Sequence, residues 1–245
     1  MAYYHCLLFD VDGTLLDFNA SEDAALHETL AHFALPETPE AVELYHAINN
    51  GLWAALERGE VRQEKLVLQR FQKLLEGLGA TGDPAKINDY YLSQLAQRAD
   101  VYEGAEDALK ALAEVATLAV VSNGVERVQT GRLERSGLGR YFDGIFISGR
   151  VGASKPSRKI FDHALRTLGV ENREKVLMIG DSLKADIGGG AGAGLATCWC
   201  NFQDAPAPQD AAPTYTITHI EELMRIVMEP EELENVGNPE KRHQV

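Results

Sequence analysis

The sequence predicts an α/β fold: a doubly wound parallel sheet with an all-helical domain inserted after its first strand. Three observations support this prediction. An apolar run at residues 5–9 is typical of a buried strand, residues 19–100 show only helical patterns, and helical and strand patterns alternate from residue 101. Because such alternation implies right-handed crossovers, the sheet is expected to be parallel and covered on both faces.

The opening strand, HCLLF at residues 5–9, ends in two carboxylates, Asp10 and Asp12. Ionised carboxylates are rarely tolerated at the end of a buried strand unless another group pairs with them. Gly13 and Thr14 follow directly, so a sharp change of chain direction is expected there. These four residues are therefore the first candidates for a functional site.

The next four segments carry apolar residues at helical spacing and are separated by Pro, Gly and Asp signals. Ser21 is the expected N-cap of the first segment. The segments are predicted at residues 21–35, 39–59, 62–79 and 84–100. The predicted division of the chain is a core domain of residues 1–17 and 101–228, a helical cap domain of residues 18–100, and a loose polar tail of residues 229–245.

The second half of the chain supplies the rest of the sheet and its covering helices. The predicted strands are TLAVVSNG, GIFISG, KVLMIGD and ATCWCN, and the helices between them are VERVQTGRLERSG, SRKIFDHALRTLG and the small-residue segment 182–194. GAEDALKALAEV forms a helix before them, and TYTITHIEELMRIV adds a short strand and a helix. Since ligands of open parallel sheets bind beyond the carboxyl ends of the strands, polar residues at those ends are candidate site residues.

Composition excludes several classes of function. The net charge of −14 disfavours a nucleic acid polymer as partner, and no basic stripe offsets it. Apolar runs are too short to cross a membrane and no signal peptide pattern is present, so a cytoplasmic protein is expected. Cys198 and Cys200 lack further soft ligands nearby and are expected to be small strand residues rather than a metal pair. No pattern assigns an oligomeric state.

Four short motifs lie in order at the predicted strand ends and helix starts: DVDGT, SNG, the lysine of SKP, and GDSLKAD. Together they resemble the haloacid dehalogenase (HAD) superfamily of phosphatases with a helical C1-type cap, over the whole chain except the tail. The segments INNGLWAALERGEV, RLERSGLGRYFD and GDSLKADIGGG resemble the YjjG/YfnB-type pyrimidine 5′-nucleotidases of that superfamily. The resemblance implies hydrolysis of nucleoside monophosphates, a small-molecule partner.

The residue types fit phosphoryl transfer through an aspartyl phosphate. Asp10 is suited to be the nucleophile, because a carboxylate is ionised at neutral pH and can accept a phosphoryl group. Asp12 is suited to protonate the leaving oxygen and then to activate water. Two residues apart on an extended chain, the two side chains are expected to face the same side. The expected phosphate-binding residues are Thr14, Ser122, Asn123 and Lys155.

A magnesium ion is expected at the same site. Asp181, Asp10 and the carbonyl oxygen of Asp12 form a set of hard oxygen ligands. Asp186 is expected to hold a metal-bound water or to orient Lys155, although a purely structural role at a helix start remains open. Like charges about 4 Å apart repel by about 4 kcal/mol at an effective dielectric constant of about 20. Four carboxylates and one lysine would therefore exclude a phosphate dianion unless Mg²⁺ were bound.

The substrate is less strongly indicated. A pyrimidine ring requires an aromatic surface and amide groups, which Phe18, Asn49 and Trp53 can supply. Trp53 is equally compatible with the core of the cap. Phosphoglycolate or a sugar phosphate is the alternative substrate. A receiver-type phospho-aspartate signalling domain is the alternative from another class, and it leaves the helical insertion unexplained. Carbon–halogen cleavage and a catalytically silent binding protein rank below these.

Overall fold

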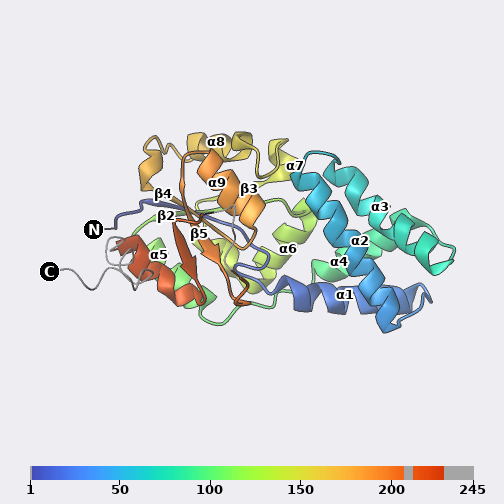
Figure 1. The fold of residues 1–245 in the computed structure, drawn as a ribbon. Helices are drawn as coiled ribbons and strands as arrows, with labels where there is room; N and C mark the ends of the chain where they lie inside the picture. Colours follow the sequence, from blue (N-terminus) through green and yellow to red (C-terminus); the bar gives the residue numbers. More distant parts are fainter. Residues whose placement is uncertain (1, 207–211, 229–245) are drawn as a thin grey trace, which may run out of the picture.

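A six-stranded parallel sheet forms the centre of the computed structural model, which describes residues 2–206 and 212–228 (Figure 1). The strands lie in the order β3-β2-β1-β4-β5-β6. Their bounds are β1 (Cys6–Phe9), β2 (Thr117–Ser122), β3 (Gly144–Ile147), β4 (Val176–Gly180), β5 (Ala196–Cys200) and β6 (Tyr215–Ile217). The predicted fold class is confirmed. The predicted loose tail, residues 229–245, lies outside the described residues.

Helices cover both faces of the sheet because side chains of successive strand residues point to opposite faces. On one face Leu7 and Phe9 pack with α5 (Ala105–Ala113), α6 (Glu126–Ser136) and α10 (Leu223–Met228). On the other, Cys6 and Leu8 pack with α8 (Arg158–Thr167) and the residues next to α9 (Gly189–Gly192). The remaining short elements are η1 (Leu138–Tyr141), α7 (Ser148–Val151), η2 (Arg173–Lys175), η3 (Leu183–Gly188) and η4 (Ile220–Glu222).

Four helices follow β1 and form a separate group to one side of the sheet (Figure 1). They are α1 (Phe18–His32), α2 (Pro39–Glu57), α3 (Gln63–Leu78) and α4 (Pro84–Leu95). They share one apolar cluster, in which Tyr45, Phe71 and Tyr91 are fully buried and which Val128 of α6 joins. We refer to α1–α4 as the helical block. Its division from the rest of the chain into a cap domain remains a prediction.

Two local predictions differ from the structure. Ser21 is not an N-cap: α1 begins at Phe18, and the Asp17 side chain accepts a hydrogen bond from the amide of Ala20. Aspartate caps a helix as well as serine does, so Asp17 starts the helix one turn earlier. The small-residue helix predicted at 182–194 begins as a π-helical turn, η3, before α9. Such turns are frequent at functional sites.

No helix among the described residues combines the length and apolar character needed to cross a membrane.

Candidate active site

A cavity of about 420 Å³ lies at the carboxyl ends of the central strands. It is positioned there because β1 and β4 are neighbours and the connections from them run in opposite directions along the sheet, the arrangement in which open α/β sheets bind ligands. Phe9 is in register with Val120 of β2 and Ile179 of β4. The residues that follow these strands therefore converge on one edge, facing the helical block.

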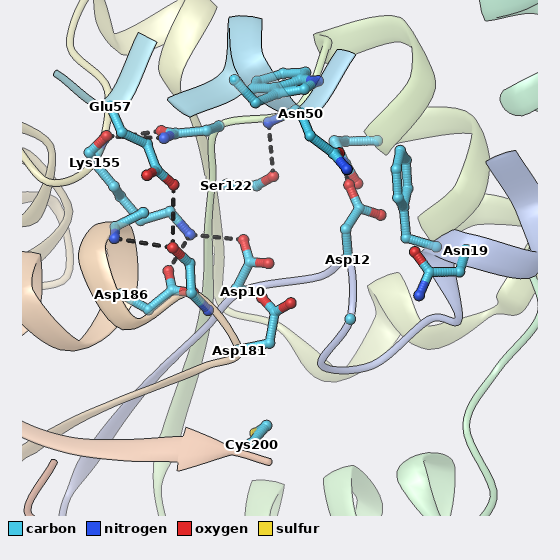
Figure 2. A pocket seen from close by; sticks show the side chains of 18 of the residues that line it. Asp10, Asp12, Asn19, Asn50, Glu57, Ser122, Lys155, Asp181, Asp186 and Cys200 are labelled. Carbon is cyan, nitrogen blue, oxygen red and sulfur yellow. Dashed lines mark hydrogen bonds and ion pairs between the residues drawn. The ribbon is translucent and has the colours of Figure 1, made fainter. Parts of the chain in front are cut away.

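Lys155 forms the centre of a buried ionic cluster. Its Nζ donates to Asp10 Oδ1 and to Asp186 Oδ1, at 2.6 Å each, and its side chain is 2% exposed (Figure 2). Burial lowers the pKa of the Lys155 ammonium, but the two carboxylates outweigh burial and raise that pKa above its ordinary value. Lys155 is therefore a fixed positive charge beside Asp10. Asp186 orients Lys155 in this structure, which is one of the two roles that the sequence suggested.

Asn123 holds the backbone of Lys155. Its side-chain oxygen accepts from the Lys155 amide at 2.8 Å, and its side-chain nitrogen donates to the Lys155 carbonyl at 2.9 Å. The residue at the end of β2 thereby fixes the lysine loop, which lies 32 residues further along the chain. Both polar atoms of the Asn123 side chain thus bind the lysine loop, which leaves the expected contact with a phosphate to its backbone amide.

Three carboxylates make a site suited to a hard cation. Oxygen atoms of Asp10, Asp181 and Asp186 all lie within 4.8 Å of one another. Asp181 is exposed at the cavity surface, but the surrounding protein still displaces water around its carboxyl group and raises its pKa, and the negative charges of Asp10 and Asp186 raise that pKa further. A bound divalent cation would relieve this repulsion, and oxygen ligands are those that Mg²⁺ prefers. The donor set therefore fits the expected ion, although here Asp186 already accepts a hydrogen bond from Lys155.

Two glycines let the backbone approach these carboxylates closely. A Cβ at Gly13 would lie 2.3 Å from Asp181 Oδ2, and Gly13 has a φ of +74°. A Cβ at Gly180 would lie 2.3 Å from Asp186 Oδ2. Both positions exclude any side chain. The role of Gly13 goes beyond the turn that the sequence predicted, and that of Gly180 was not foreseen.

Asp12 has partners different from those of Asp10. Gln129 Nε2 donates to Asp12 Oδ2 at 2.5 Å, and Arg132 forms an ion pair with Asp12 Oδ1. Figure 2 shows the Asp12 carboxylate apart from the cluster around Lys155. Burial raises the pKa of Asp12, as does Asp10, whereas Arg132 and Gln129 act in the opposite direction.

The other predicted phosphate ligands are placed differently from one another. Ser122 is buried but lines the cavity, and its Oγ accepts from the amide of Gly124 at 3.0 Å. Thr14 is fully buried, does not line the cavity, and donates its backbone amide to Val11 at 3.4 Å. The structure therefore brings Ser122 to the cavity and leaves Thr14 behind it.

The helical block closes the far side of the cavity. Phe18, Asn49 and Trp53, the three predicted substrate residues, all line it. The Asn49 amide is already used, because it donates to Glu22 at 2.9 Å and its oxygen accepts from Arg70. Asn49 is 1% exposed, so it supports the wall rather than offering a free group.

Comparison with known proteins connects this geometry to a family. The family model of haloacid dehalogenase-like hydrolases matches residues 4–194.

This chain belongs to that family.

Three relatives are similar to this chain over almost their whole length. The chain is 39% identical to the HAD-hydrolase YfnB of Bacillus subtilis, covering 93% of this chain and 97% of that one. It is 36% identical to the pyrimidine 5′-nucleotidase YjjG of Escherichia coli (90% and 96% covered) and 37% identical to the pyrimidine 5′-nucleotidase PynA of Streptococcus pneumoniae (91% and 94%). A crystal structure of YfnB, described as bound to magnesium, superposes with a TM-score of 0.86 over 91% of this chain and 98% of that one. The predicted resemblance is confirmed.

Several residues around the cavity were missed by sequence reasoning. Gln129 and Arg132 lie on the buried face of α6, where two polar residues among apolar ones were a usable signal. Glu57 at the end of α2 accepts from Ser182 Oγ at 3.1 Å and so joins the helical block to the loop after β4. Asn19 and Asn50 also line the cavity, and nothing in their spacing indicated it.

Proposed function

We propose that this haloacid dehalogenase-like hydrolase is a Mg²⁺-dependent phosphatase of pyrimidine nucleoside 5′-monophosphates that acts through a phosphorylated Asp10. The observation that carries this proposal is the position of Lys155, whose ammonium bridges Asp10 and Asp186 in the cavity between the sheet and the helical block. A fixed cation beside a nucleophilic carboxylate is suited to receive a phosphoryl group. A receiver-type signalling domain does not fit the family to which the chain belongs.

The proposed reaction has two steps. A carboxylate oxygen of Asp10 attacks phosphorus, the ester P–O bond breaks, and Asp12 gives its proton to the departing oxygen to form the alcohol. Asp12 then takes a proton from water while the water oxygen attacks the same phosphorus. The Asp10–phosphorus bond breaks, which releases inorganic phosphate and restores both carboxyl groups. Lys155 keeps Asp10 oriented and faces the negative phosphate oxygens.

Magnesium is assigned to the carboxylates of Asp10 and Asp181 and to the carbonyl oxygen of Asp12, with Asp186 behind them. When bound, it would supply positive charge that lets a phosphate dianion approach these carboxylates. The close oxygen atoms of Asp10, Asp181 and Asp186 support this assignment. Ser122 and the backbone amide of Asn123 are proposed to bind phosphate oxygens on the opposite side.

The helical block is proposed to recognise the base. Phe18 and Trp53 offer aromatic surface to a pyrimidine ring. The side chains of Asn19 and Asn50 line the cavity and form no hydrogen bonds with other described residues, so they, rather than Asn49, have free donors and acceptors for a base. The cavity of about 420 Å³ falls within the usual range for small-molecule sites, about 300–1,000 Å³. Two relatives named as pyrimidine 5′-nucleotidases support the same substrate class.

The test is phosphate release from a panel of UMP, dUMP, dTMP, purine nucleotides, sugar phosphates and phosphoglycolate, each with Mg²⁺ and with EDTA. We expect turnover of the pyrimidine nucleotides that EDTA abolishes. Asp10→Asn is expected to abolish turnover while the protein keeps its cooperative unfolding transition. Turnover of sugar phosphates or phosphoglycolate alone would reject the nucleotide assignment, and activity in Asp10→Asn would reject the proposed nucleophile.

A further inference from the structure

Two polar residues of α6, Gln129 and Arg132, are completely buried and both bind Asp12. Gln129 Nε2 donates to Asp12 Oδ2 at 2.5 Å, and an Arg132 guanidinium nitrogen donates to Asp12 Oδ1. Both oxygens of the Asp12 carboxylate are thus held from one helix. The Asp12 side chain is still 24% exposed and lines the cavity, so the held group remains within reach of a ligand.

Arg132 also contacts both places where the chain passes between the sheet and the helical block. One guanidinium nitrogen donates to Ser21 Oγ in the first turns of α1, at 3.1 Å. Its Nε donates to the carbonyl of Arg98, after α4, at 3.1 Å. The two passages are also joined to each other, because the amide of Asp17 donates to the carbonyl of Asp100 at 2.7 Å. Arg132 therefore connects Asp12 to both segments that join the sheet to the helical block, the one before α1 and the one after α4.

The choice of partner argues against a purely structural role. A buried guanidinium needs an anionic partner, and Asp12 is the one that Arg132 has among the described residues. A second carboxylate, that of Asp100, lies nearby: its Oδ2 accepts a hydrogen bond at 2.9 Å from the Ser21 hydroxyl to which Arg132 donates. Arg132 nevertheless pairs with the carboxylate that lines the cavity.

We infer that Arg132, assisted by Gln129, is the positioning residue for Asp12. We infer also that it couples the position of the Asp12 carboxylate to both segments that join the sheet to the helical block. The inference rests on the proposed function, in which Asp12 protonates the departing ester oxygen. Proton transfer requires donor and acceptor to lie within hydrogen-bond reach, so the place of the carboxylate decides whether the step occurs. Nucleophilic attack by Asp10 does not depend on that place.

Esters with different leaving groups distinguish proton transfer from Asp12 from nucleophilic attack by Asp10. An alkoxide, such as the one that leaves from UMP or β-glycerophosphate, is a strong base and needs the proton of Asp12 as the P–O bond breaks. p-Nitrophenolate is a weak base and leaves without a proton. Misplacing Asp12 should therefore lower kcat/KM, which reports the steps up to departure of the leaving group, much more for the alkyl esters than for the aryl ester. Hydrolysis of the phosphorylated Asp10, in which Asp12 activates water, is common to all three esters and affects kcat alone. β-Glycerophosphate stands beside UMP so that the result does not depend on nucleotide preference.

The experiment measures kcat and KM for UMP, β-glycerophosphate and p-nitrophenyl phosphate with saturating Mg²⁺. For Asp12→Asn we expect a loss of about 10²- to 10⁴-fold in kcat/KM on the alkyl esters. For Arg132→Met we expect a loss of about 10²-fold in kcat/KM on the alkyl esters and a much smaller loss in kcat/KM on the aryl ester. Gln129→Met should show the same pattern more weakly, and it serves where Arg132→Met fails to fold.

A double variant and a matched control decide between positioning and structure. Because Arg132 acts through Asp12, Arg132→Met should cause no further loss in an Asp12→Asn background. Arg127→Met is the control: Arg127 lies on the same helix and pairs with Asp89 of α4 at 2.6 Å, without touching Asp12. It should change all three esters by the same factor. Urea unfolding of every variant verifies that it is folded.

Two outcomes would overturn the inference, and they are distinguishable. If Asp12→Asn lowers kcat/KM equally for the alkyl and aryl esters, the acid role of Asp12 fails and the inference fails with it. If Asp12→Asn discriminates between the esters but Arg132→Met and Gln129→Met do not, the acid role stands and only the positioning role is rejected.

Discussion

Replacing Lys155 by methionine is the sharpest test of how the site is assembled. The change removes a buried ammonium that donates to Asp10 and Asp186 at 2.6 Å each. Each such charge-assisted hydrogen bond contributes about 1.5–3 kcal/mol, and removing one partner of a buried ion pair typically destabilises a protein by about 3–5 kcal/mol. Two carboxylates, 1% and 11% exposed at their side chains, would lose their cation. We therefore expect a loss of about 3–5 kcal/mol in the free energy of unfolding in EDTA.

Magnesium should change the size of that loss. A divalent cation bound between Asp10 and Asp181 replaces part of the missing positive charge, so the destabilisation measured by urea unfolding should be smaller in Mg²⁺ than in EDTA. Catalysis should not be rescued in the same way, because Lys155 also faces the transferring phosphoryl group. Removing one such donor typically lowers kcat by about 10²- to 10³-fold.

The control for this variant is Lys184→Met, which removes an exposed lysine from η3, close to the same cluster in the chain. It should leave stability and kcat near those of the unmodified protein. If Lys155→Met kept its kcat within about threefold of that control, or lost equal stability with and without Mg²⁺, the electrostatic account of the site would be refuted.

Two further predictions concern the metal site and the helical block. Gly13→Ala should weaken Mg²⁺ binding, because the new Cβ would meet Asp181 Oδ2 at 2.3 Å; titrating activity with the metal measures the effect. Gly79→Ala is the control, since Gly79 shares a positive φ but a Cβ there would have nothing within 4 Å. An equal effect of Gly79→Ala on Mg²⁺ binding would contradict this reasoning. A hydrogen bond to Glu22 raises the pKa of His46 despite partial burial, so the protonated form stabilises the fold. This stabilisation should be complete below the unfolded pKa of about 6.5 and lost as pH rises through the higher folded pKa. Urea unfolding should show that slope, and His46→Gln should flatten it; an unchanged slope would assign it to other groups.

The cluster around Lys155 was predictable because it follows from topology. A buried parallel strand ending in Asp10, another ending before Asp181 and a lysine in a neighbouring loop must converge once the strands are adjacent and in register. The family motifs named the same residues independently. The hydrogen bond between Lys155 and Asp186 is in keeping with the suggested orienting role of Asp186, which stays a prediction.

Other parts depend on contacts that no local pattern encodes. Arg132 and Asp12 are 120 residues apart, and their pairing is set by how α6 packs between the sheet and the helical block. Thr14 was predicted to bind phosphate from its place in a motif, and no local pattern indicated that it would be fully buried after the turn at Gly13. Asn49 was chosen for its amide, and only the packing of α1 against α2 reveals that Glu22 occupies that amide.

The chain contains two tryptophans, Trp53 in the helical block and Trp199 in β5, and both form part of the cavity wall. The indole nitrogen of Trp199 donates to the carbonyl of Asp181 at 2.9 Å, so that ring is hydrogen-bonded directly to the residue proposed to bind magnesium. Tryptophan fluorescence, excited where the tyrosines absorb little, consequently originates at the cavity wall. Cation loading and ligand entry can be followed in real time without attaching a dye, with Trp53→Phe and Trp199→Phe separating the signals of the two walls.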